Sequence, residues 1–368
     1  MDTQASRRRD PGIAATWLLL AILALALRLP DIGNPLIDLD EQFYLLVGDR
    51  MLHGAIPYVD IWDRKPVGLF LIYAAARAVG GDSWIGYQLV ATAAAALTSG
   101  VIALLARRLA TGWAGLCAGA VYLVWIELLG GRGGQAPVFY NGLIAGAALL
   151  TWLAIERPDT RWRHGIAAML LVGLALQIKP TVVFEGAWFG VALLIGAWRR
   201  GVRPGALAGY ALALVGLALA PTVIAYAVYL GIGHGDAWWF ANVESIFLRI
   251  TPPGEPIAGR LIGIALNLLI PAGAACFGLA RLTSTARWVI GGWLVVAIVG
   301  LLAVPPYFNH YALPLIVPIA VLAGIGMAAS RPFAMLVGVT AAALLLLSGY
   351  PHLGDRRAAR HQVAALAA

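Results

Sequence analysis

The chain has 368 residues, of which 61% are hydrophobic and only 12% are charged, and its formal net charge is +8. Soluble domains carry about 25% charged residues, so this composition excludes a soluble globular protein and indicates a membrane protein. The apolar runs are continuous and do not alternate with polar residues, which indicates helices and excludes a β-barrel. The basic excess is interpreted first as membrane topology, and we expect no nucleic-acid partner.

Eleven apolar segments are predicted to cross the membrane as helices. They are residues 13–29, 84–106, 113–130, 137–155, 165–178, 181–198, 206–230, 258–280, 286–304, 311–329 and 332–349. The fold class is therefore all-α, polytopic and integral to the membrane. Residues 1–350 are expected to form a single transmembrane domain, followed by a short polar tail over 351–368.

One further apolar run, residues 66–79, is too short for its length to decide whether it crosses. Arg7–Arg9 precede the first span and place the N-terminus inside by the positive-inside rule. If 66–79 does not cross, nearly every later basic cluster falls in the cytoplasm, whereas a crossing would move these clusters outside. We therefore expect 66–79 to be an extracytoplasmic juxtamembrane helix with Pro66 in its first turn.

The acidic loop over 31–65 stands out in this apolar chain, because it carries seven of the 18 acidic residues. The charge distribution places it outside. Within it, a helical segment is predicted from Asp40 to Gly54, with Asp40 and Tyr44 one turn apart on the same face. Concentrated carboxylates in one external loop favour chemistry over simple solvation, although capping of the helix by Asp38 or Asp40 is the plain alternative.

Several other polar residues fall on the same side of the membrane. Lys65 lies at the end of the acidic loop, and Lys179 and Arg132 lie in later outward loops, where a cation needs a carboxylate partner or an anionic ligand. The remaining candidates for substrate contacts are Glu41, Tyr44, Asp60, Trp62, His310 and Tyr311.

These residue types suit transfer of a sugar from a polyprenyl phosphate. A phosphate leaves without a general acid, so one carboxylate is needed to take the proton from an acceptor hydroxyl. Fixed positive charge is needed to hold the departing phosphate. The best candidates are Asp40 as base, Asp63 as a supporting acid, and Lys65, Lys179 and Arg132 as phosphate contacts. Direct displacement would invert the anomeric centre.

Four stretches carry a resemblance to a known family: DLDEQFY after the first span, LLVGDRMLHGAIPYVDIWDRKP, GLALQIKP near 173–180 and FNHYALPLIVP near 308–318. They resemble the GT-C-fold glycosyltransferases of the protein O-mannosyltransferase and aminoarabinose-transferase type. The resemblance runs from the first span to about residue 318. It implies a membrane enzyme that uses a polyprenyl-phosphate sugar, and a juxtamembrane helix after the first loop.

The resemblance also implies two residue roles. The Asp of the first Asp-Glu pair would be the catalytic base, which is Asp40, and the Lys before Pro would contact the donor phosphate, which is Lys65. The chain departs from the family pattern at Pro66-Val67, where two prolines are usual. We also expect no large extracytoplasmic C-terminal domain of the kind that longer members have, so loops and the membrane cavity are expected to recognise the acceptor.

Two other functions compete with this one. A transporter or flippase of lipid-linked glycans would more often show repeated halves and polar residues near mid-membrane, and a non-catalytic scaffold would not explain the acids. The acceptor is expected to be a glycan, a lipid or a protein, at the outer face of a plasma or inner membrane. A divalent cation held by Asp40, Glu41 and Asp63 is an open alternative, although no ligand spacing demands one.

Overall fold

The computed structural model describes residues 10–81, 83–248, 254–352 and 357–359, and over these ranges the chain is helical. The α-helices are α1 (Ile13–Arg28), α2 (Leu39–Leu52), α3 (Val67–Gly80), α4 (Ile85–Leu109), α5 (Gly112–Leu128), α6 (Ala136–Glu156), α7 (Arg161–Leu176), α8 (Val183–Arg199), α9 (Pro204–Gly231), α10 (Gly235–Trp239), α11 (Ser245–Phe247), α12 (Ile257–Arg281), α13 (Ser284–Leu302), α14 (Leu313–Ala329) and α15 (Arg331–Leu347). Short 3-10 turns are η1 (Pro158–Thr160), η2 (Pro180–Val182) and η4 (Asn309–Ala312), and η3 (Phe240–Glu244) is a π-helical turn.

A helix occurs at each of the eleven predicted spans. Within the described residues, seven helices are long and apolar enough to cross a membrane: α4, α6, η2 with α8, α9, α12, α13, and η4 with α14. Four shorter apolar helices accompany them, namely α1, α3, α5 and α15. The chain is therefore an all-α multi-pass membrane protein, and the number of crossings stays a prediction. Most of the predicted tail, and Arg7–Arg9, lie outside the described residues.

The centre of the bundle is α14, in which every residue from Leu313 to Gly326 except Pro314 is buried. Glycines bring its neighbours close. A Cβ on Gly326 would lie 2.1 Å from the Ala274 carbonyl oxygen of α12, and one on Gly324 would lie 2.5 Å from the Ala114 carbonyl oxygen of α5. Small residues allow this close approach in membranes, where apolar side chains gain little by leaving lipid for protein.

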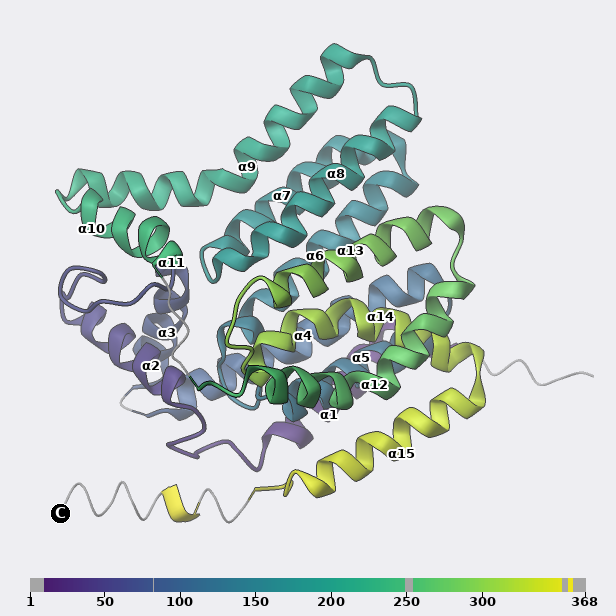
Figure 1. Cartoon of the computed structure of the whole chain (residues 1–368), viewed down its shortest axis with the longest axis horizontal. Coiled ribbons are helices and arrows are strands. Elements are labelled where there is room, and N and C mark those ends of the chain that lie inside the picture. Colours follow the sequence, from purple (N-terminus) through teal and green to yellow (C-terminus); the bar gives the residue numbers. More distant parts are fainter. Residues whose placement is uncertain (1–9, 82, 249–253, 353–356, 360–368) are drawn as a thin grey trace, which may run out of the picture.

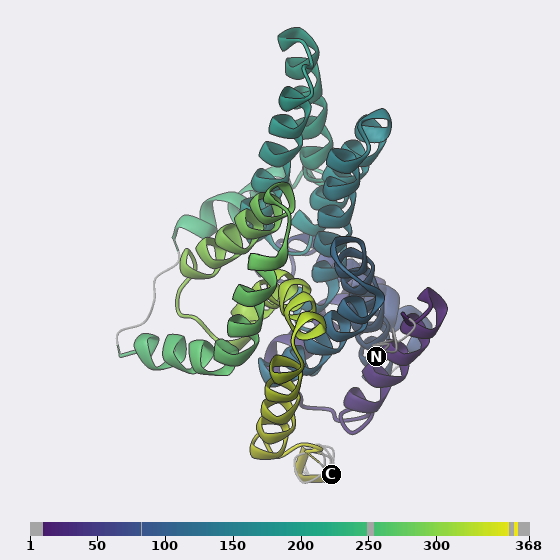
Figure 2. The same ribbon diagram turned by 90° about the vertical axis from the view of Figure 1, so that its right-hand side faces the viewer.

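The outer helices show the opposite pattern. α9 lies at the edge of the bundle (Figures 1 and 2), and its Leu212 and Ile224 side chains are 75% and 63% exposed. Exposed aliphatic side chains along a long apolar helix are the surface that a bilayer would cover.

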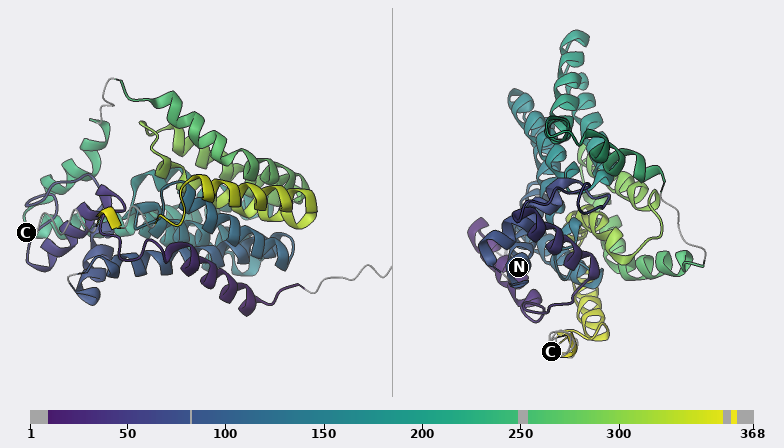
Figure 3. Two further views of the ribbon diagram at one scale, coloured as in Figure 1. Left: turned by 90° about the horizontal axis from the view of Figure 1, so that it is seen from below. Right: turned by 90° about the vertical axis from the view of Figure 1, so that its left-hand side faces the viewer.

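The short helices gather at one end of the bundle. α2, α3, α10 and α11 lie together at the left of Figure 1, and the left panel of Figure 3 shows the long helices extending away from α2 and α10. α1 ends and α4 begins at this same end, because the Gln88 side chain donates to the Asn34 carbonyl oxygen (2.7 Å) and accepts from the Gly33 N–H (2.6 Å). The helix α3 between them, at the position predicted for the juxtamembrane helix, therefore does not run through the bundle.

Candidate active site

A cavity of about 240 Å³ opens at the end of the bundle where α2 begins. Six segments line it: the first two turns of α2, the end of the loop before α3, the start of α6, the turn before α8, α11, and the segment between α13 and α14. The lining residues are Asp40, Tyr44, Arg64, Lys65, Gln135, Ala136, Pro137, Lys179, Pro180, Thr181, Ile246, Ala303, Val304, Pro305, His310 and Tyr311. Six of the residues proposed from the sequence thus meet in one cavity.

The start of α2 decides which of its two acids faces the cavity. Asp38 is the N-cap, and its Oδ1 accepts the Asp40 N–H at 2.9 Å. The predicted capping role thus falls to Asp38, which leaves the Asp40 carboxylate available to the cavity. Successive helical residues point about 100° apart, so Glu41 turns inward, where it is fully buried against Gly133.

Burial raises the pKa of Glu41 to about 8. The backbone N–H of Gly134 and the charge of Arg28 lower this pKa but only partly offset the effect of burial. Glu41 was proposed as a substrate contact, but its carboxylate lies behind the cavity. It packs α2 against the loop of residues 131–134 and does not line the space that a substrate could enter.

Tyr44 joins the acid to the first lysine. Its hydroxyl donates to Asp40 Oδ2 at 3.3 Å, and the Lys65 Nζ lies 5.3 Å from the centre of its ring. Burial and the neighbouring charge of Asp40 raise the pKa of Tyr44, so the phenol stays protonated and donates. The ring is held in turn by Phe70 and Tyr73 of α3. Asp40 and Lys65 therefore both lie beside one buried aromatic side chain.

The loop before α3 is folded back on itself and places Lys65. Tyr58 adopts a left-handed φ of +70° and donates its hydroxyl to the Lys65 carbonyl oxygen at 2.8 Å. The Asp60 carboxylate accepts the Ile56 N–H at 2.7 Å, and Asp63 Oδ1 accepts the Arg64 N–H at 2.5 Å. Asp60 and Asp63 thus shape the loop that presents Lys65, and neither lines the cavity.

The opposite wall carries the second lysine. Lys179 precedes η2, and its Nζ lies 4.7 Å from the centre of the Tyr311 ring, so each lysine of the cavity has a tyrosine face beside it. His310 packs edge-on against Tyr311 and parallel to Phe308. Both residues begin α14 through η4, as the sequence motif predicted, and both line the cavity.

Three helices direct their positive ends at the same space. α6, α8 with its leading turn η2, and α14 with its leading turn η4 all begin at the cavity, and none of them has a side-chain N-cap. The free N–H groups and aligned dipoles of helix N-termini favour an anion. Together with Lys65, Lys179 and Arg64, they make the cavity strongly suited to a negatively charged group.

Arg132 lies elsewhere. Its guanidinium forms a two-pronged ion pair with Asp31, with Nε to Oδ2 at 3.0 Å and Nη2 to Oδ1 at 2.5 Å. Nearby, Arg28 pairs with Glu127 at 3.1 Å and donates to the carbonyl oxygens of Gly131 and Gly133. This network anchors the loop before α6, so Arg132 shapes the cavity wall and does not line it. Trp62 also lies outside the cavity, against Phe240 and Arg64.

Ten of the 16 cavity residues were not chosen from the sequence, and Gln135 and Arg64 are two of the polar ones. Gln135 is at the N-cap position of α6, is 1% exposed and lies beside the Asp38 carboxylate. Arg64 lines the cavity beside Lys65. Nothing local distinguishes Gln135 in the sequence, because its importance comes from the helix that begins there. Within the described part of the chain, no group of three His, Cys, Asp or Glu side chains could hold a metal ion.

Comparison with known proteins gives one family and one fold. Residues 63–226 match the model of the dolichyl-phosphate-mannose-protein mannosyltransferase family, which is less than half of the chain. The sequence matches none of the curated proteins with which it was compared.

Solved structures match over most of the chain. The ArnT structures from Cupriavidus metallidurans, in the apo state and bound to undecaprenyl phosphate, both superimpose with a TM-score of 0.67 at 17% identity. The matches cover 89% and 90% of this chain but only 62% and 63% of ArnT, so the chain spans about three-fifths of the length of these proteins. The oligosaccharyltransferase AglB from Archaeoglobus fulgidus, in complex with an inhibitory peptide and a dolichol-phosphate, matches with a TM-score of 0.52 at 12% identity, over 94% of this chain and 55% of AglB.

Proposed function

We propose that this chain, a multi-pass membrane protein with the GT-C fold of these glycosyltransferases, moves a sugar from a polyprenyl-phosphate donor to an acceptor hydroxyl. The observation that carries the proposal is the meeting of Asp40, Lys65 and Lys179 in one cavity, although they come from three segments of the chain. One carboxylate beside two cations and three helix N-termini is the set of groups that the transfer of a phosphate-linked sugar requires.

In the proposed reaction, the acceptor oxygen attacks the anomeric carbon and its proton passes to Asp40. The bond between the anomeric carbon and the phosphate oxygen breaks, and the polyprenyl phosphate leaves with the electron pair. Lys65, Lys179 and the helix N-termini hold the charge that develops on this phosphate. A single displacement inverts the anomeric centre. The Tyr44 hydroxyl orients Asp40 by donating to the oxygen that does not take the proton.

The other predicted residues take supporting roles in this proposal. His310 and Tyr311 contact the substrate from the start of α14. Asp63 holds the loop that carries Lys65, and its charge acts on Tyr44. Arg132 was expected to contact the donor phosphate. We propose instead that it has a structural role through its ion pair with Asp31. The fold is supported by ArnT and AglB, whose structures contain undecaprenyl phosphate and dolichol-phosphate respectively.

The cavity is proposed to face the extracytoplasmic side of a cell membrane. Asp31, Asp38 and the other acids lie at the cavity end of the bundle, whereas the basic loops alternate with the cavity loops along the chain and therefore belong to the other end. The acceptor would be a glycan, a lipid or a protein that reaches this face.

The test uses the purified protein in liposomes that contain a radiolabelled polyprenyl-phosphate sugar. Candidate acceptors are added outside, and both transfer of label and movement of the donor between leaflets are measured. Transfer with release of polyprenyl phosphate supports the proposal. Leaflet exchange of intact donor without any transfer to any acceptor would contradict it and would support a transporter.

A further inference from the structure

A second, smaller cavity adjoins the first at Lys179, and we call it the branch. It has a volume of about 30 Å³ and shares Lys179, Thr181, Val304 and Tyr311 with the main cavity. Its other lining residues come from α6, α8, α13 and the start of α14, and they include two polar residues, Tyr140 and Glu185. None of the roles derived above uses either residue.

Glu185 lies in the first turn of α8 and is 4% exposed. Its Oε1 accepts the indole N–H of the fully buried Trp293 at 2.7 Å. A carboxylate can accept several hydrogen bonds, so Glu185 can accept a further one from a group that enters the cavity. The contact with Trp293 alone would explain Glu185 as a polar link between α8 and α13. It does not explain why the carboxylate also lines a cavity.

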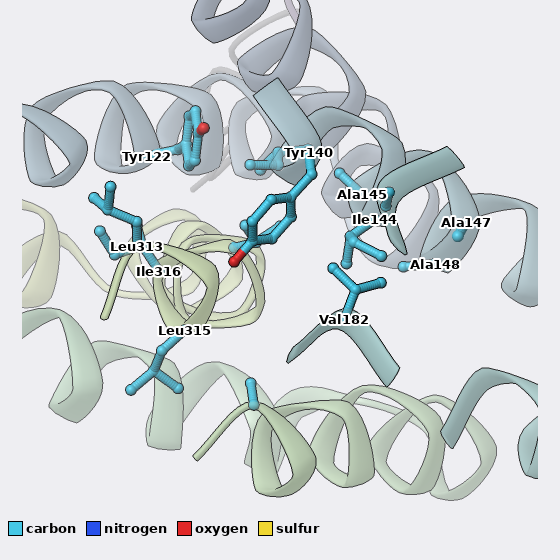
Figure 4. Packing of buried hydrophobic residues seen from close by; sticks show 14 of the residues in the cluster. Tyr122, Tyr140, Ile144, Ala145, Ala147, Ala148, Val182, Leu313, Leu315 and Ile316 are labelled. Atoms are coloured by element: carbon cyan, nitrogen blue, oxygen red, sulfur yellow. The ribbon is translucent and has the colours of Figure 1, made fainter. Parts of the chain in front are cut away.

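Tyr140 supplies the complementary group. It lies in the second turn of α6 and is 1% exposed, and its hydroxyl lies beside the Thr181 side chain but forms no hydrogen bond of good geometry among the described residues. Figure 4 shows the ring extending from α6 toward Leu313, Leu315 and Ile316 at the start of α14. A buried hydroxyl without a partner is destabilising unless a ligand or a water molecule satisfies it.

The size of the branch limits what enters it. A volume of about 30 Å³ holds roughly two water molecules, since each needs about 10–15 Å³ measured in this way. A sugar ring cannot fit, but one substituent that projects from the ring can. The branch begins at Lys179, which we have placed on the donor phosphate, so the sugar attached to that phosphate is the part of the donor beside its mouth.

From these observations, and on the basis of the glycosyltransferase function proposed above, we propose that the branch is a specificity subsite for the exocyclic hydroxymethyl group of a hexosyl donor. Glu185 accepts the hydrogen bond of that hydroxyl, and Tyr140 donates to its oxygen. The subsite would select hexose donors over pentose and 6-deoxyhexose donors, because a donor without the hydroxyl makes neither the hydrogen bond to Glu185 nor the one from Tyr140.

The test compares kcat/KM for pairs of polyprenyl-phosphate donors that differ only in the hydroxyl at the exocyclic carbon, with the wild-type protein and with Tyr140→Phe and Glu185→Gln. We expect the wild type to prefer the hexosyl donor by at least tenfold. Tyr140→Phe should reduce this preference several-fold through a slower reaction of the hexosyl donor, with the deoxy donor nearly unchanged. Tyr122→Phe is the matched control, because Tyr122 is also fully buried and does not line either cavity.

The outcomes separate the two proposals. If the wild type uses deoxy or pentosyl donors as well as hexosyl ones, or if Tyr140→Phe and Glu185→Gln slow all donors equally, the subsite is wrong while the transferase function stands. If the wild type transfers from no polyprenyl-phosphate sugar, the proposed function itself fails. Thermal unfolding of each variant in detergent identifies a loss of fold, and Tyr140→Phe is expected to fold because it removes an unpaired hydroxyl.

Discussion

Lys65 shows how single residues are set in this cavity. Its backbone is fixed by the Tyr58 hydroxyl and its side chain lies over Tyr44, which itself bonds to Asp40. One buried tyrosine thus sets the relative positions of the proposed base and the proposed phosphate contact. The proposed reaction depends on this pairing of an acid and a cation at a fixed separation.

Replacement of Lys65 by alanine is predicted to reduce kcat/KM for the lipid-phosphate donor by about 10²–10³-fold, because one fixed contact to the developing phosphate charge is lost. Lys65→Arg should recover part of the rate, since it keeps the charge. Steady-state transfer assays at several donor concentrations measure both. Equal rates for Lys65→Ala and the wild type would remove Lys65 from the mechanism.

Glu41 makes stability depend on pH. Its ordinary pKa is 4.5 and burial raises it to about 8 in the folded protein. Below pH 4.5 both states hold the proton. Between 4.5 and about 8 only the folded state holds it, so Glu41 makes stability fall as the pH rises, by at most about 1.4 kcal/mol per unit. Above pH 8 this loss is complete.

Glu41→Gln, which cannot ionise, is therefore predicted to unfold at a higher temperature than the wild type at pH 8 and at a similar temperature at pH 5. Thermal unfolding in detergent at both pH values measures this. If Glu41→Gln is destabilised equally at pH 5 and pH 8, the ionisation of Glu41 does not control stability, and a polar contact of its side chain does.

At the scale of the elements, α2 reaches its position only because it packs closely on α3. A Cβ on Gly48 would lie 2.6 Å from the backbone nitrogen of Ala74, a contact that no real side chain makes. The buried face of α2 (Glu41, Tyr44, Val47 and Gly48) follows from this contact. The orientation of Asp40 therefore depends on a glycine two turns away.

Gly48→Ala is predicted to destabilise the protein by roughly 1–3 kcal/mol, because the added methyl group must push the two helices apart. Transfer activity should fall with it, since Asp40 and Lys65 move relative to each other. Gly209→Ala on α9 is the matched control, because a Cβ there meets nothing within 4 Å. Equal unfolding temperatures for Gly48→Ala and Gly209→Ala would contradict the close packing of α2 on α3 at Gly48.

The sequence predicts the positions of the helices better than it predicts the contacts between them. Long apolar runs such as the one at α14 identify the helices, and charge distribution identifies the run at α3 as the exception. α10 and α11, within a segment expected to be a loop, are short and have no clear period. The pairing of Arg132 with Asp31 could not be predicted, because the partners are 101 residues apart and are joined by packing of the loop before α6.

At the scale of the whole molecule, the arrangement of α1, α3 and α4 fixes which loops share an end of the bundle. Because α3 does not run through the bundle, the acidic loop and the later cavity loops lie together. The resemblance and the acids of the first loop predicted a site at the end of the bundle where the cavity lies, but the composition of the cavity required the folded chain. Gln135, Lys179 and Tyr311 become neighbours only when α6, α8 and α14 pack together.

This arrangement predicts the sidedness of the protein. In a background in which Cys117 and Cys276 are replaced by alanine, Ser83→Cys, just after α3, should react with a membrane-impermeant maleimide in intact cells. Asp159→Cys, in the loop between α6 and α7, should react only after permeabilisation. The reverse pattern would mean that the cavity faces the cytoplasm.

The most direct test of the central claim is the rate of sugar transfer by Asp40→Asn. The purified wild type, Asp40→Asn and the control Asp236→Asn, an exposed acid on α10, are compared in liposomes with a labelled polyprenyl-phosphate sugar and an acceptor. We predict that Asp40→Asn loses about 10²–10⁴-fold in kcat while it still binds the donor, because only the acceptance of the proton is removed. Asp236→Asn should retain the wild-type rate. Full transfer activity in a stably inserted Asp40→Asn protein would contradict the role of Asp40 as the base.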